Sequence, residues 1–457
     1  MKKTRLALFA VFCALVSSAG VAHQKSSPRF LSFPKGFNWC VATSAHQIEG
    51  YNENSDWWDW EHQPGHIKNG EVSGAACDHW NRLEEDADLI RALHATKYRF
   101  SVEWAKIQPR EGVWDLEALE HYRREVLILR ERGIEPFITL QHFTLPRWVA
   151  AHGGLEWAGF SEAFTLYAKR VVGELAPLGV RDWVTFNEPM VVIAGGYVRG
   201  VFPPGHTAKS VEDVLRPIEG FLRAHARAYH ELKAVSPGIR IGLAHHLRLI
   251  DPANPVNPLS RVLAFYLDKA FNWAFFNAIE TGRLQFKAPV VGKIDIAVPG
   301  LKGSQDYVGV NYYSRDVISI DRKAFGYVKF GPKRGRPVND LNWEIYPKGF
   351  HRILKEVAKR VPSKPILITE NGIADSRDAQ RPSFIVNHLR ELHRAMAEGI
   401  RIEAYCHWSL MDNFEWAEGF TPRFGLYEVD YKTFKRTPRA SARIFSKIAR
   451  ENGLWVR

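Results

Sequence analysis

Cysteine is scarce in this sequence, with only four residues among 457. So few cysteines exclude a small scaffold held together by a framework of disulfides. One of them, Cys13, lies in an apolar N-terminal segment, which leaves an odd number, three, in the rest of the chain. Cys40 and Cys406 lie in apolar runs, so we expect them to be buried free thiols.

Metal-binding and nucleotide-binding motifs are also missing. No spacing of cysteine and histidine matches a structural zinc site. His245 and His246 are adjacent rather than four residues apart, so we interpret them as the end of a strand and not as a pair of ligands. The sequence therefore predicts no metal and no cofactor.

Linkers are absent from the long C-terminal part of the chain. Residues 30–457 contain no Gly/Ser-rich linker and no low-complexity tract, so we interpret them as one domain. The chain is 46% hydrophobic and 25% charged, which is typical of a globular protein and excludes an intrinsically disordered one.

The N-terminus differs in composition from the rest. Lys2, Lys3 and Arg5 precede an apolar run over residues 6–16, and small residues follow up to Ala22. This order predicts a secretory signal peptide over residues 1–22 and export to the periplasm or the extracellular medium. The alternative is an uncleaved anchor, but the run is shorter than the ~20 residues that a membrane span requires. We expect no stable membrane insertion.

The formal net charge is +12, of which three positive charges lie in the N-terminal segment. A basic chain can bind nucleic acid or a membrane surface. Here lysine and arginine are interspersed with acidic residues and no nucleic-acid motif is present, so we favour a solvated basic surface. Arg439, Arg443 and Lys447 are spaced four apart, which predicts one exposed face of a terminal helix.

A repeated unit is the main feature of residues 30–457: a short β-branched or aromatic run, followed by a segment with helical spacing. Helical segments include Asp78–Leu93, Leu116–Arg132 and Phe160–Leu175. Eight such units predict an α/β fold, a single (β/α)₈ TIM barrel with a parallel sheet and loops inserted at its C-terminal face. The eight predicted strand runs are Phe37–Ser44, Lys97–Trp104, Pro136–His142, Asp182–Asn187, Ile239–His245, Asp306–Tyr312, Pro365–Thr369 and Ile402–Trp408.

Polar residues gather where several of these runs end. The carboxyl ends of barrel strands meet at one face, where active sites are built, so we expect these side chains to share one cleft. Long segments such as Ser314–Tyr346 follow some runs and are expected to shape that cleft. The residues at the run ends are Arg99 and Trp104, His142, Asn187 and Glu188, Asn311 and Tyr313, Glu370 and Asn371, and Trp408.

Glu188 and Glu370 each follow a predicted buried strand. Two carboxyl groups that face each other across a sugar are what cleavage of a glycosidic bond requires: one protonates the leaving oxygen, and the other attacks or stabilises the anomeric carbon. The alternative is a pair of rim carboxylates engaged in salt bridges, since ion-pair networks also place acids there.

Five motifs in order resemble those of glycoside hydrolase family 1, the β-glucosidase family, and the resemblance covers nearly all of residues 33–450. Phe37–Gly50 is similar to the opening motif of that family and Tyr98–Trp104 to its second-strand motif. Thr185–Pro189 (TFNEP) and Ile368–Gly372 (ITENG) resemble its two catalytic signatures, and Trp408–Trp416 resembles its sugar-binding segment.

The resemblance implies an O-glycosyl hydrolase, a retaining β-glycosidase that acts on β-glycosides or oligosaccharides. Glu188 would be the general acid and then the general base, and Glu370 the nucleophile that forms a covalent glycosyl-enzyme. Glu188 would be protonated while Glu370 is ionised, because the charge of Glu370 raises the proton affinity of Glu188. Arg99 and Tyr313 would hold the nucleophile, and Asn311 would orient the pair. Arg99 also fits a core ion pair, and Asn311 a turn residue.

Further positions match those that bind the sugar in the family. Asn187 would bind the 2-hydroxyl, Trp408 would form a stacking floor, Phe424 an apolar wall and Trp343 the platform for the aglycone. Core packing for Trp408 and Phe424, a structural role for His142 and surface cover for Trp343 are the alternatives. The residues expected around the sugar itself are Gln47, His142, Asn187, Glu415 and Trp416.

The sequence departs from the family pattern at a few positions around this site. Cys40 stands where glycine is common and His46 where tyrosine is common, which we interpret as packing changes under the sugar site. Phe143 and Thr144 follow His142 where the family often has Trp and Asp, so the shape of the sugar site and its preferred sugar stay open.

Two rival functions remain. A 6-phospho-β-glycosidase needs cations for the phosphate, whereas Glu415 would repel it and Ala417–Gly419 supplies no cation. A catalytically inactive barrel that binds sugar would be expected to lack Glu188 or Glu370, and both are present.

Overall fold

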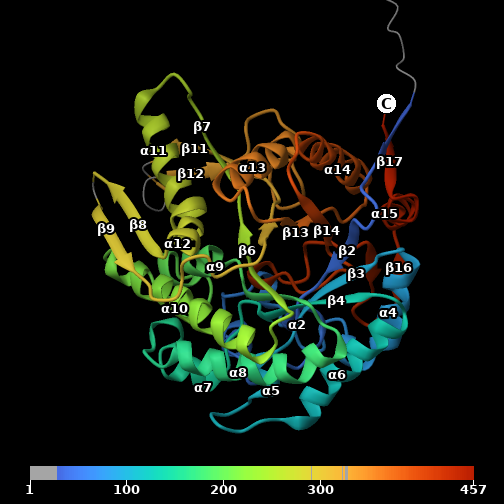
Figure 1. Ribbon diagram of the computed structural model, residues 1–457. Coiled ribbons are helices and arrows are strands. Elements are labelled where there is room, and N and C mark those ends of the chain that lie inside the picture. The colour runs from blue at the N-terminus through green and yellow to red at the C-terminus, as the bar shows by residue number, and fades with distance from the viewer. Residues whose placement is uncertain (1–27, 290, 322, 325–327, 457) are drawn as a thin grey trace, which may run out of the picture.

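Eight parallel strands form a closed barrel in the computed structural model, which describes residues 28–289, 291–321, 323–324 and 328–456 (Figure 1). The neighbour order around the barrel is β10-β13-β14-β2-β3-β4-β5-β6. Each predicted run overlaps one of these strands, so the predicted TIM barrel is confirmed. The strands are β2 (Asn38–Ala42), β3 (Lys97–Ser101), β4 (Glu135–Gln141), β5 (Asp182–Asn187), β6 (Arg240–His246), β10 (Val308–Asn311), β13 (Ile366–Gly372) and β14 (Ile402–Trp408).

The barrel strands are apolar on both faces because each face is covered. In β13, Ile366 and Ile368 pack in the main core against the helices, whereas Leu367 belongs to a second, smaller cluster. Strands β2, β4, β5, β6, β13 and β14 all contribute to this smaller cluster, so it lies inside the barrel. The alternation of small and large inward side chains, such as Ala244 and Phe137, fills the interior.

Helices form the outer layer around the barrel (Figure 1). Asp115 begins α6, where its carboxylate accepts a hydrogen bond from the Ala118 N–H at 2.9 Å. The three predicted helical segments correspond to α4, α6 and α8. The longer helices are α4 (Leu83–Ala92), α6 (Leu116–Glu131), α8 (Phe160–Leu175), α10 (Glu212–Val235), α11 (Pro258–Asp268), α13 (Pro347–Arg360), α14 (Arg381–Ala397) and α15 (Ala440–Glu451).

Additional strands and short helices are inserted between the elements of the barrel. A three-stranded sheet of β7 (Leu249–Pro252), β11 (Arg315–Ile320) and β12 (Val328–Gly331) follows the carboxyl ends of β6 and β10. Strand β1 (Arg29–Ser32) pairs with β17 (Gly453–Val456), which brings the two ends of the described chain together. Other insertions are α2 (Ala45–Ile48), α3 (Asp56–Glu61), α5 (Trp104–Ile107), α7 (Arg147–Ala151), α9 (Pro189–Val192), α12 (Phe275–Thr281), the π-helical turns Ile193–Val198 and Lys269–Ala274, and the strand pairs β8 (Arg283–Ala288) with β9 (Gly292–Ala297) and β15 (Tyr427–Val429) with β16 (Arg436–Pro438).

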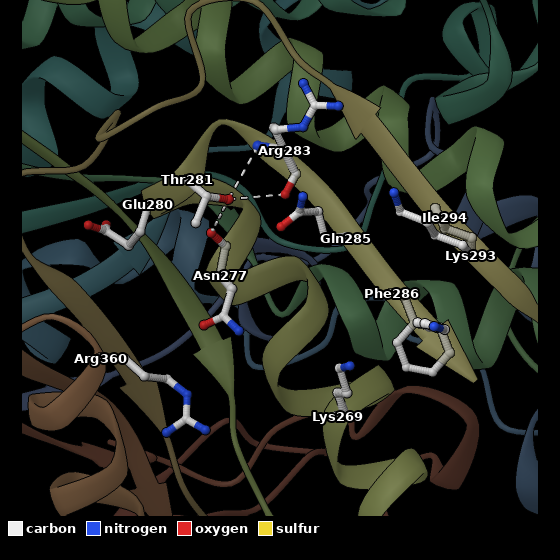
Figure 2. Close-up of a pocket in the computed structure, with 11 residues that line it drawn as sticks. Lys269, Asn277, Glu280, Thr281, Arg283, Gln285, Phe286, Lys293, Ile294 and Arg360 are labelled. Atoms are coloured by element: carbon white, nitrogen blue, oxygen red, sulfur yellow. Dashed lines mark hydrogen bonds between the residues drawn. The ribbon is translucent and has the colours of Figure 1, made fainter. Parts of the chain in front are cut away.

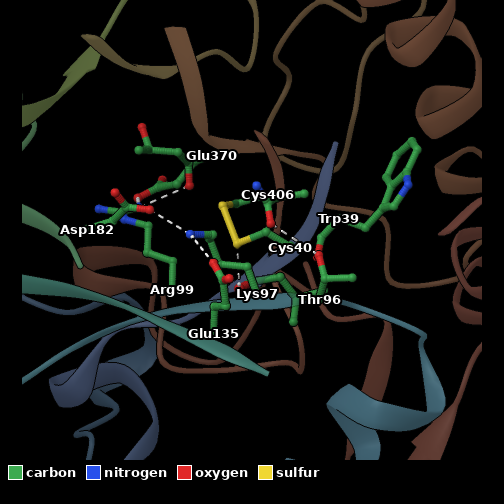
Figure 3. Close-up of a disulfide and its surroundings, with 12 residues drawn as sticks. Trp39, Cys40, Thr96, Lys97, Arg99, Glu135, Asp182, Glu370 and Cys406 are labelled. Carbon is green, nitrogen blue, oxygen red and sulfur yellow. Dashed lines mark hydrogen bonds and ion pairs between the residues drawn. A yellow bond between two sulfur atoms is a disulfide. The ribbon is translucent and has the colours of Figure 1, made fainter. Parts of the chain in front are cut away.

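A disulfide joins Cys40 of β2 to Cys406 of β14, so the expectation that both are free thiols is wrong (Figure 3). The two residues are 366 positions apart in the sequence, but closure of the barrel makes β2 and β14 neighbours and sets these cysteines opposite each other. Their Cα atoms are 4.1 Å apart. Cys77 is a buried free thiol.

The terminal helix α15 follows the expected pattern only in part. Arg443 and Lys447 are exposed. Arg439, which immediately precedes α15, is instead buried, and its Nη2 lies 2.7 Å from Oδ2 of Asp412. The prediction of an exposed position is therefore wrong for Arg439, because this residue forms a buried ion pair with Asp412 on the segment after β14.

The predicted signal peptide, residues 1–22, lies outside the described residues. Within the described ranges, no helix combines the length and the apolar character needed to cross a membrane.

Candidate active site

Two buried glutamates lie at the carboxyl-terminal face of the barrel. Glu188 directly follows β5 and Glu370 lies near the end of β13, and they are 6% and 3% exposed. Asn311, the last residue of β10, is paired in register with Glu370 and donates a hydrogen bond from Nδ2 to Glu188 Oε1 at 2.7 Å. Asn311 thus lies beside Glu370 through strand pairing and contacts Glu188 through its side chain.

Glu370 is held by one cation and one hydroxyl. Arg99 Nη1 donates to Oε1 at 2.6 Å, and the Tyr313 hydroxyl donates to Oε2 at 2.5 Å. Burial raises the pKa of Glu370 to about 7, an increase that the charge of Glu188 enhances and that Arg99 and Tyr313 oppose. The predicted contacts of Arg99 and Tyr313 with Glu370 are present in the structure.

Glu188 has different partners. Its Oε1 accepts from Asn311 and from His246 Nδ1, which lies 2.9 Å away. Burial by itself raises the pKa of Glu188, but the interaction with His246, the hydrogen bond of Asn311 and the charge of Arg248 outweigh it, so the pKa is lowered. The two pKa shifts therefore run opposite to the expectation that the charge of Glu370 keeps Glu188 protonated, because His246 and Arg248 stabilise the Glu188 carboxylate.

Arg99 joins the strands beneath the site. Besides Glu370, its Nη1 donates to the Thr369 carbonyl at 3.1 Å, and its Nη2 donates to Asn187 Oδ1 at 2.8 Å. The side chain is fully buried, so the alternative reading of Arg99 as a core ion pair holds together with its contact to the predicted nucleophile.

Amide and imidazole groups continue this network. Asn187 Nδ2 lies 3.0 Å from His142 Nε2, and Asn311 Nδ2 lies 3.1 Å from Asn187 Oδ1. The Thr369 hydroxyl donates to Asn311 Oδ1 at 2.5 Å. Burial lowers the pKa of His142 well below its usual range, so its ring is neutral and Nε2 accepts from Asn187.

The remaining predicted sugar-binding residues surround the same space. Gln47 Nε2 donates to the Phe414 carbonyl at 2.9 Å and to Glu415 Oε2 at 3.4 Å. Burial and the charges of the two catalytic-site glutamates raise the pKa of Glu415 to about 8. The ring of His142 stacks on Trp408 and Trp416, with centroids 5.8 Å and 6.0 Å away.

Phe424 and Trp343 both pack against Tyr313. The Tyr313 ring centroid is 6.1 Å from that of Phe424 and 5.8 Å from that of Trp343. Phe424 is 2% exposed, whereas Trp343 is partly exposed. Both therefore pack in the interior cluster next to the predicted nucleophile, and Trp343 retains an open face.

The departures from the family pattern lie behind the sugar site. His46 stacks on Trp416 with centroids 5.6 Å apart and pairs with Glu61 at 3.2 Å. Phe143 contacts Trp416 with centroids 4.7 Å apart. Both are packing residues that support Trp416, as expected for His46.

His246 is the residue of this site that the sequence interpretation missed. It was correctly placed at the end of β6 but was given no function. The rule that polar residues at strand ends face the cleft, applied to β6 as it was to β5 and β13, would have selected it.

A separate pocket of about 400 Å³ lies between α12, β8 and β9 (Figure 2). Five basic residues line it together with Glu280, and it contains none of the predicted site residues. Part of its charge is neutralised, since Arg283 Nε lies 2.8 Å from Asp295 Oδ1. Among the described residues, no group of three or more His, Cys, Asp or Glu is placed to hold a metal ion.

A (β/α)₈ barrel with two buried carboxyl groups and a surrounding set of amide, imidazole and indole groups at the C-terminal face has the architecture of a glycoside hydrolase. The family comparison agrees: the model described as "Glycosyl hydrolase family 1" matches residues 30–454, and the chain belongs to this family. The protein is therefore an O-glycosyl hydrolase.

Relatives and solved structures of this family cover nearly the whole chain. Beta-glucosidase A of Thermotoga maritima is 35% identical over 92% of this chain and 98% of that protein. A beta-galactosidase of Pyrococcus woesei is 31% identical over 92% of this chain and 98% of that protein. The structure of a beta-glycosidase from Pyrococcus horikoshii has a TM-score of 0.85 at 35% identity, over 93% of this chain and 96% of that chain.

Proposed function

We propose that this enzyme is a retaining β-glycosidase that hydrolyses terminal β-linked sugars, with Glu370 as nucleophile and Glu188 as acid/base. The observation that carries the proposal is the unequal environment of the two carboxyl groups. Glu370 faces a guanidinium and a phenol, which stabilise a carboxylate, whereas Glu188 faces Asn311 and His246.

The first step forms a glycosyl-enzyme. A Glu370 oxygen attacks the anomeric carbon, the C–O bond to the aglycone breaks, and Glu188 transfers its proton to the departing oxygen. A bound glycoside offers the glycosidic oxygen as an acceptor that only protonated Glu188 satisfies, so binding raises the pKa of Glu188. Arg99 keeps Glu370 ionised at the same time.

The second step hydrolyses the ester. Formation of the ester removes the negative charge of Glu370, which lowers the proton affinity of Glu188. Glu188 then takes a proton from water, and the hydroxide attacks the anomeric carbon and releases the Glu370 carboxylate. Two inversions leave the sugar in the β-configuration.

The sugar in this proposal is a terminal β-glucoside or β-galactoside. The names of the relatives from Thermotoga maritima and Pyrococcus woesei support this class. Gln47, His142, Asn187 and Glu415 supply the donors and acceptors that a ring with several hydroxyls requires. A 6-phosphorylated sugar is disfavoured because Ala417–Gly419 supplies no cation, and the nearby Lys68 is already paired with Glu418 at 3.1 Å.

Export is part of the proposal. The basic, apolar and small-residue order of residues 1–22 is that of a secretory signal. A disulfide between Cys40 and Cys406 is typical of an oxidising compartment, and it supports a periplasmic or extracellular location.

The test uses Glu370→Ala and Glu188→Ala with azide as an added nucleophile, after a panel of nitrophenyl glycosides has identified the preferred sugar. In Glu370→Ala, azide replaces the nucleophile, so we expect rescue with an α-glycosyl azide as product. In Glu188→Ala, azide attacks the glycosyl-enzyme, so we expect a β-glycosyl azide.

Each variant is the control for the other. The same product from both, or full hydrolysis by Glu370→Ala without azide, contradicts the roles. A wild-type protein inactive on the whole panel would support the inactive sugar-binding barrel.

A further inference from the structure

His246 ends β6 directly beside Glu188. The backbone N–H of Glu188 donates to the Ala244 carbonyl at 2.8 Å, which places the end of β6 against the residue that follows β5. The register of β5 and β6 shifts between Val184 and Asn187, so Asn187 pairs with Ala244 and His246 extends past it. This shift brings the imidazole Nδ1 to within 2.9 Å of Glu188 Oε1.

The contacts of the other ring nitrogen, Nε2, determine which nitrogen of His246 carries the hydrogen. Arg248 Nε and Nη2 lie 3.1 Å and 2.8 Å from His246 Nε2. A guanidinium has only donors, so Nε2 must be the acceptor and cannot carry hydrogen. The ring hydrogen is therefore on Nδ1, which donates to Glu188.

Neighbouring groups hold this arrangement in place. The His246 ring stacks on Tyr313 with centroids 5.8 Å apart and an interplanar angle of 17°, and it meets Phe271 edge-on with centroids 6.1 Å apart. Arg248 is fixed from behind by Asp316, whose Oδ2 lies 2.6 Å from Nη1. The side chains of His246 and Glu188 are each 7% exposed. Rotation of either group would break a buried, charge-assisted hydrogen bond.

These hydrogen bonds make the two carboxyl oxygens of Glu188 different. Oε1 accepts from both His246 Nδ1 and Asn311 Nδ2. A carboxyl oxygen has two lone-pair positions, so two N–H donors leave Oε1 with no place for a proton. Oε2 is the oxygen that remains for the proton.

We propose that His246, oriented by Arg248, is a positioning residue that makes Oε2 of Glu188 the oxygen which delivers the proton to the leaving group and takes it back from water. This inference rests on the proposed acid/base role of Glu188. It assigns a function to the Arg248–His246 pair that the catalytic steps themselves do not require.

The pair also has an effect on the pH profile. The charged groups that face Glu188 are Glu370 and Glu415 across the cleft and Arg248 behind His246, with Tyr313 alongside. Among these neighbours, His246 and Arg248 lower the pKa of Glu188, whereas the two glutamates act in the opposite direction. Loss of the His246 donor therefore destabilises the carboxylate and raises the pKa of the acid.

The experiment compares His246→Phe, which keeps an aromatic ring beside Tyr313 but has no donor, with His246→Asn, whose amide can donate to Oε1. The basic limb of kcat for an alkyl glycoside reports protonated Glu188 in the enzyme–substrate complex, and we expect it to move up by about one pH unit in His246→Phe, since a hydrogen bond to a charged group is lost. We expect kcat/KM for alkyl glycosides to fall about 10–100-fold, and that for 2,4-dinitrophenyl glycosides to change less than about threefold, since only poor leaving groups need the proton. His246→Asn should recover most of both effects.

The matched control is His245→Asn, the same change one residue earlier on β6. His245 packs against Phe276 among the helices, with centroids 5.0 Å apart, and should leave the basic limb in place. If His246→Phe does not fold, Arg248→Met gives the second test, because removal of this partly exposed cation should also move the limb upward.

Two outcomes separate the inference from the proposed function. If Glu188→Ala slows alkyl and dinitrophenyl glycosides equally, the acid/base role itself is wrong. If Glu188→Ala discriminates between them but folded His246→Phe has the wild-type basic limb and leaving-group dependence, the positioning role of His246 is overturned while the function stands.

Discussion

Arg99 of β3 and Glu370 of β13 form an ion pair inside the barrel, with 2.6 Å between Nη1 and Oε1. Two strands, β14 and β2, separate β3 from β13 in the barrel wall, so the pair crosses the interior. Arg99 is fully buried, and removing one partner of such a pair typically costs about 3–5 kcal/mol. The contact therefore contributes to the fold as well as to the ionisation of Glu370.

Arg99→Met should shift the acidic limb of kcat, which reports ionised Glu370 in the enzyme–substrate complex, to higher pH. Arg99 lowers the pKa of Glu370, so its loss raises that pKa above the present value of about 7, and the ionised nucleophile then forms only at higher pH. We expect activity at pH 6 to fall by more than 10-fold. The measurement is a pH profile of the folded variant, with Arg227→Met on the exposed face of α10 as control. An unchanged acidic limb would show that Arg99 does not control Glu370.

Glu188→Ala should make the rate depend steeply on the leaving group. General acid catalysis contributes about 10²–10⁴-fold where the departing oxygen needs a proton, and little where it does not. We therefore expect a large loss with alkyl β-glycosides and a small loss in the first step with dinitrophenyl glycosides. Pre-steady-state rates over a series of leaving groups measure this. A slope equal to that of the wild-type enzyme argues against an acid role.

Cys40 and Cys406 should resist alkylation in the unreduced, denatured protein. The disulfide leaves Cys77 as the free thiol of residues 28–456. Mass spectrometry after alkylation should therefore find the label on Cys77 and on the other two only after reduction. Replacing both partners with alanine should lower the free energy of unfolding by about 2–4 kcal/mol. Cys77→Ala is the control for loss of a buried thiol, and label on Cys40 without reduction would refute the pairing.

Glu103→Gln should weaken the loss of stability that accompanies a rise in pH. Burial raises the pKa of Glu103 from 4.5 to about 7 in the folded protein, so folding takes up a proton. Its stabilising contribution is complete below pH 4.5 and is lost as the pH rises through 7, at up to about 1.4 kcal/mol per pH unit. Urea unfolding at pH 5 and pH 8 measures the difference. The exposed Glu131→Gln of α6 is the control and should keep the wild-type slope.

Much of this fold follows from local pattern. Runs such as Pro365–Thr369 are nearly uninterrupted apolar strings and are separated by amphipathic segments, so the sequence itself indicates the eight-fold repeat. The positions of Glu188 and Glu370 at strand ends follow in the same way, because parallel strands bring their carboxyl ends to one face wherever the barrel closes. The family motifs then add Arg99 and Tyr313, whose contacts are as expected.

Three features of the protein could be identified only from the tertiary structure. The Cys40–Cys406 bond depends on closure between the first and last barrel strands, and burial of Arg439 depends on where Asp412 comes to lie. The contact of His246 with Glu188 depends on a register shift between neighbouring strands. Apolar runs and the strand ends that follow them are encoded by residues close in sequence, so the chain determines them by itself. Register, closure and the pKa of a buried acid depend on distances between residues far apart in sequence, and only packing sets those distances.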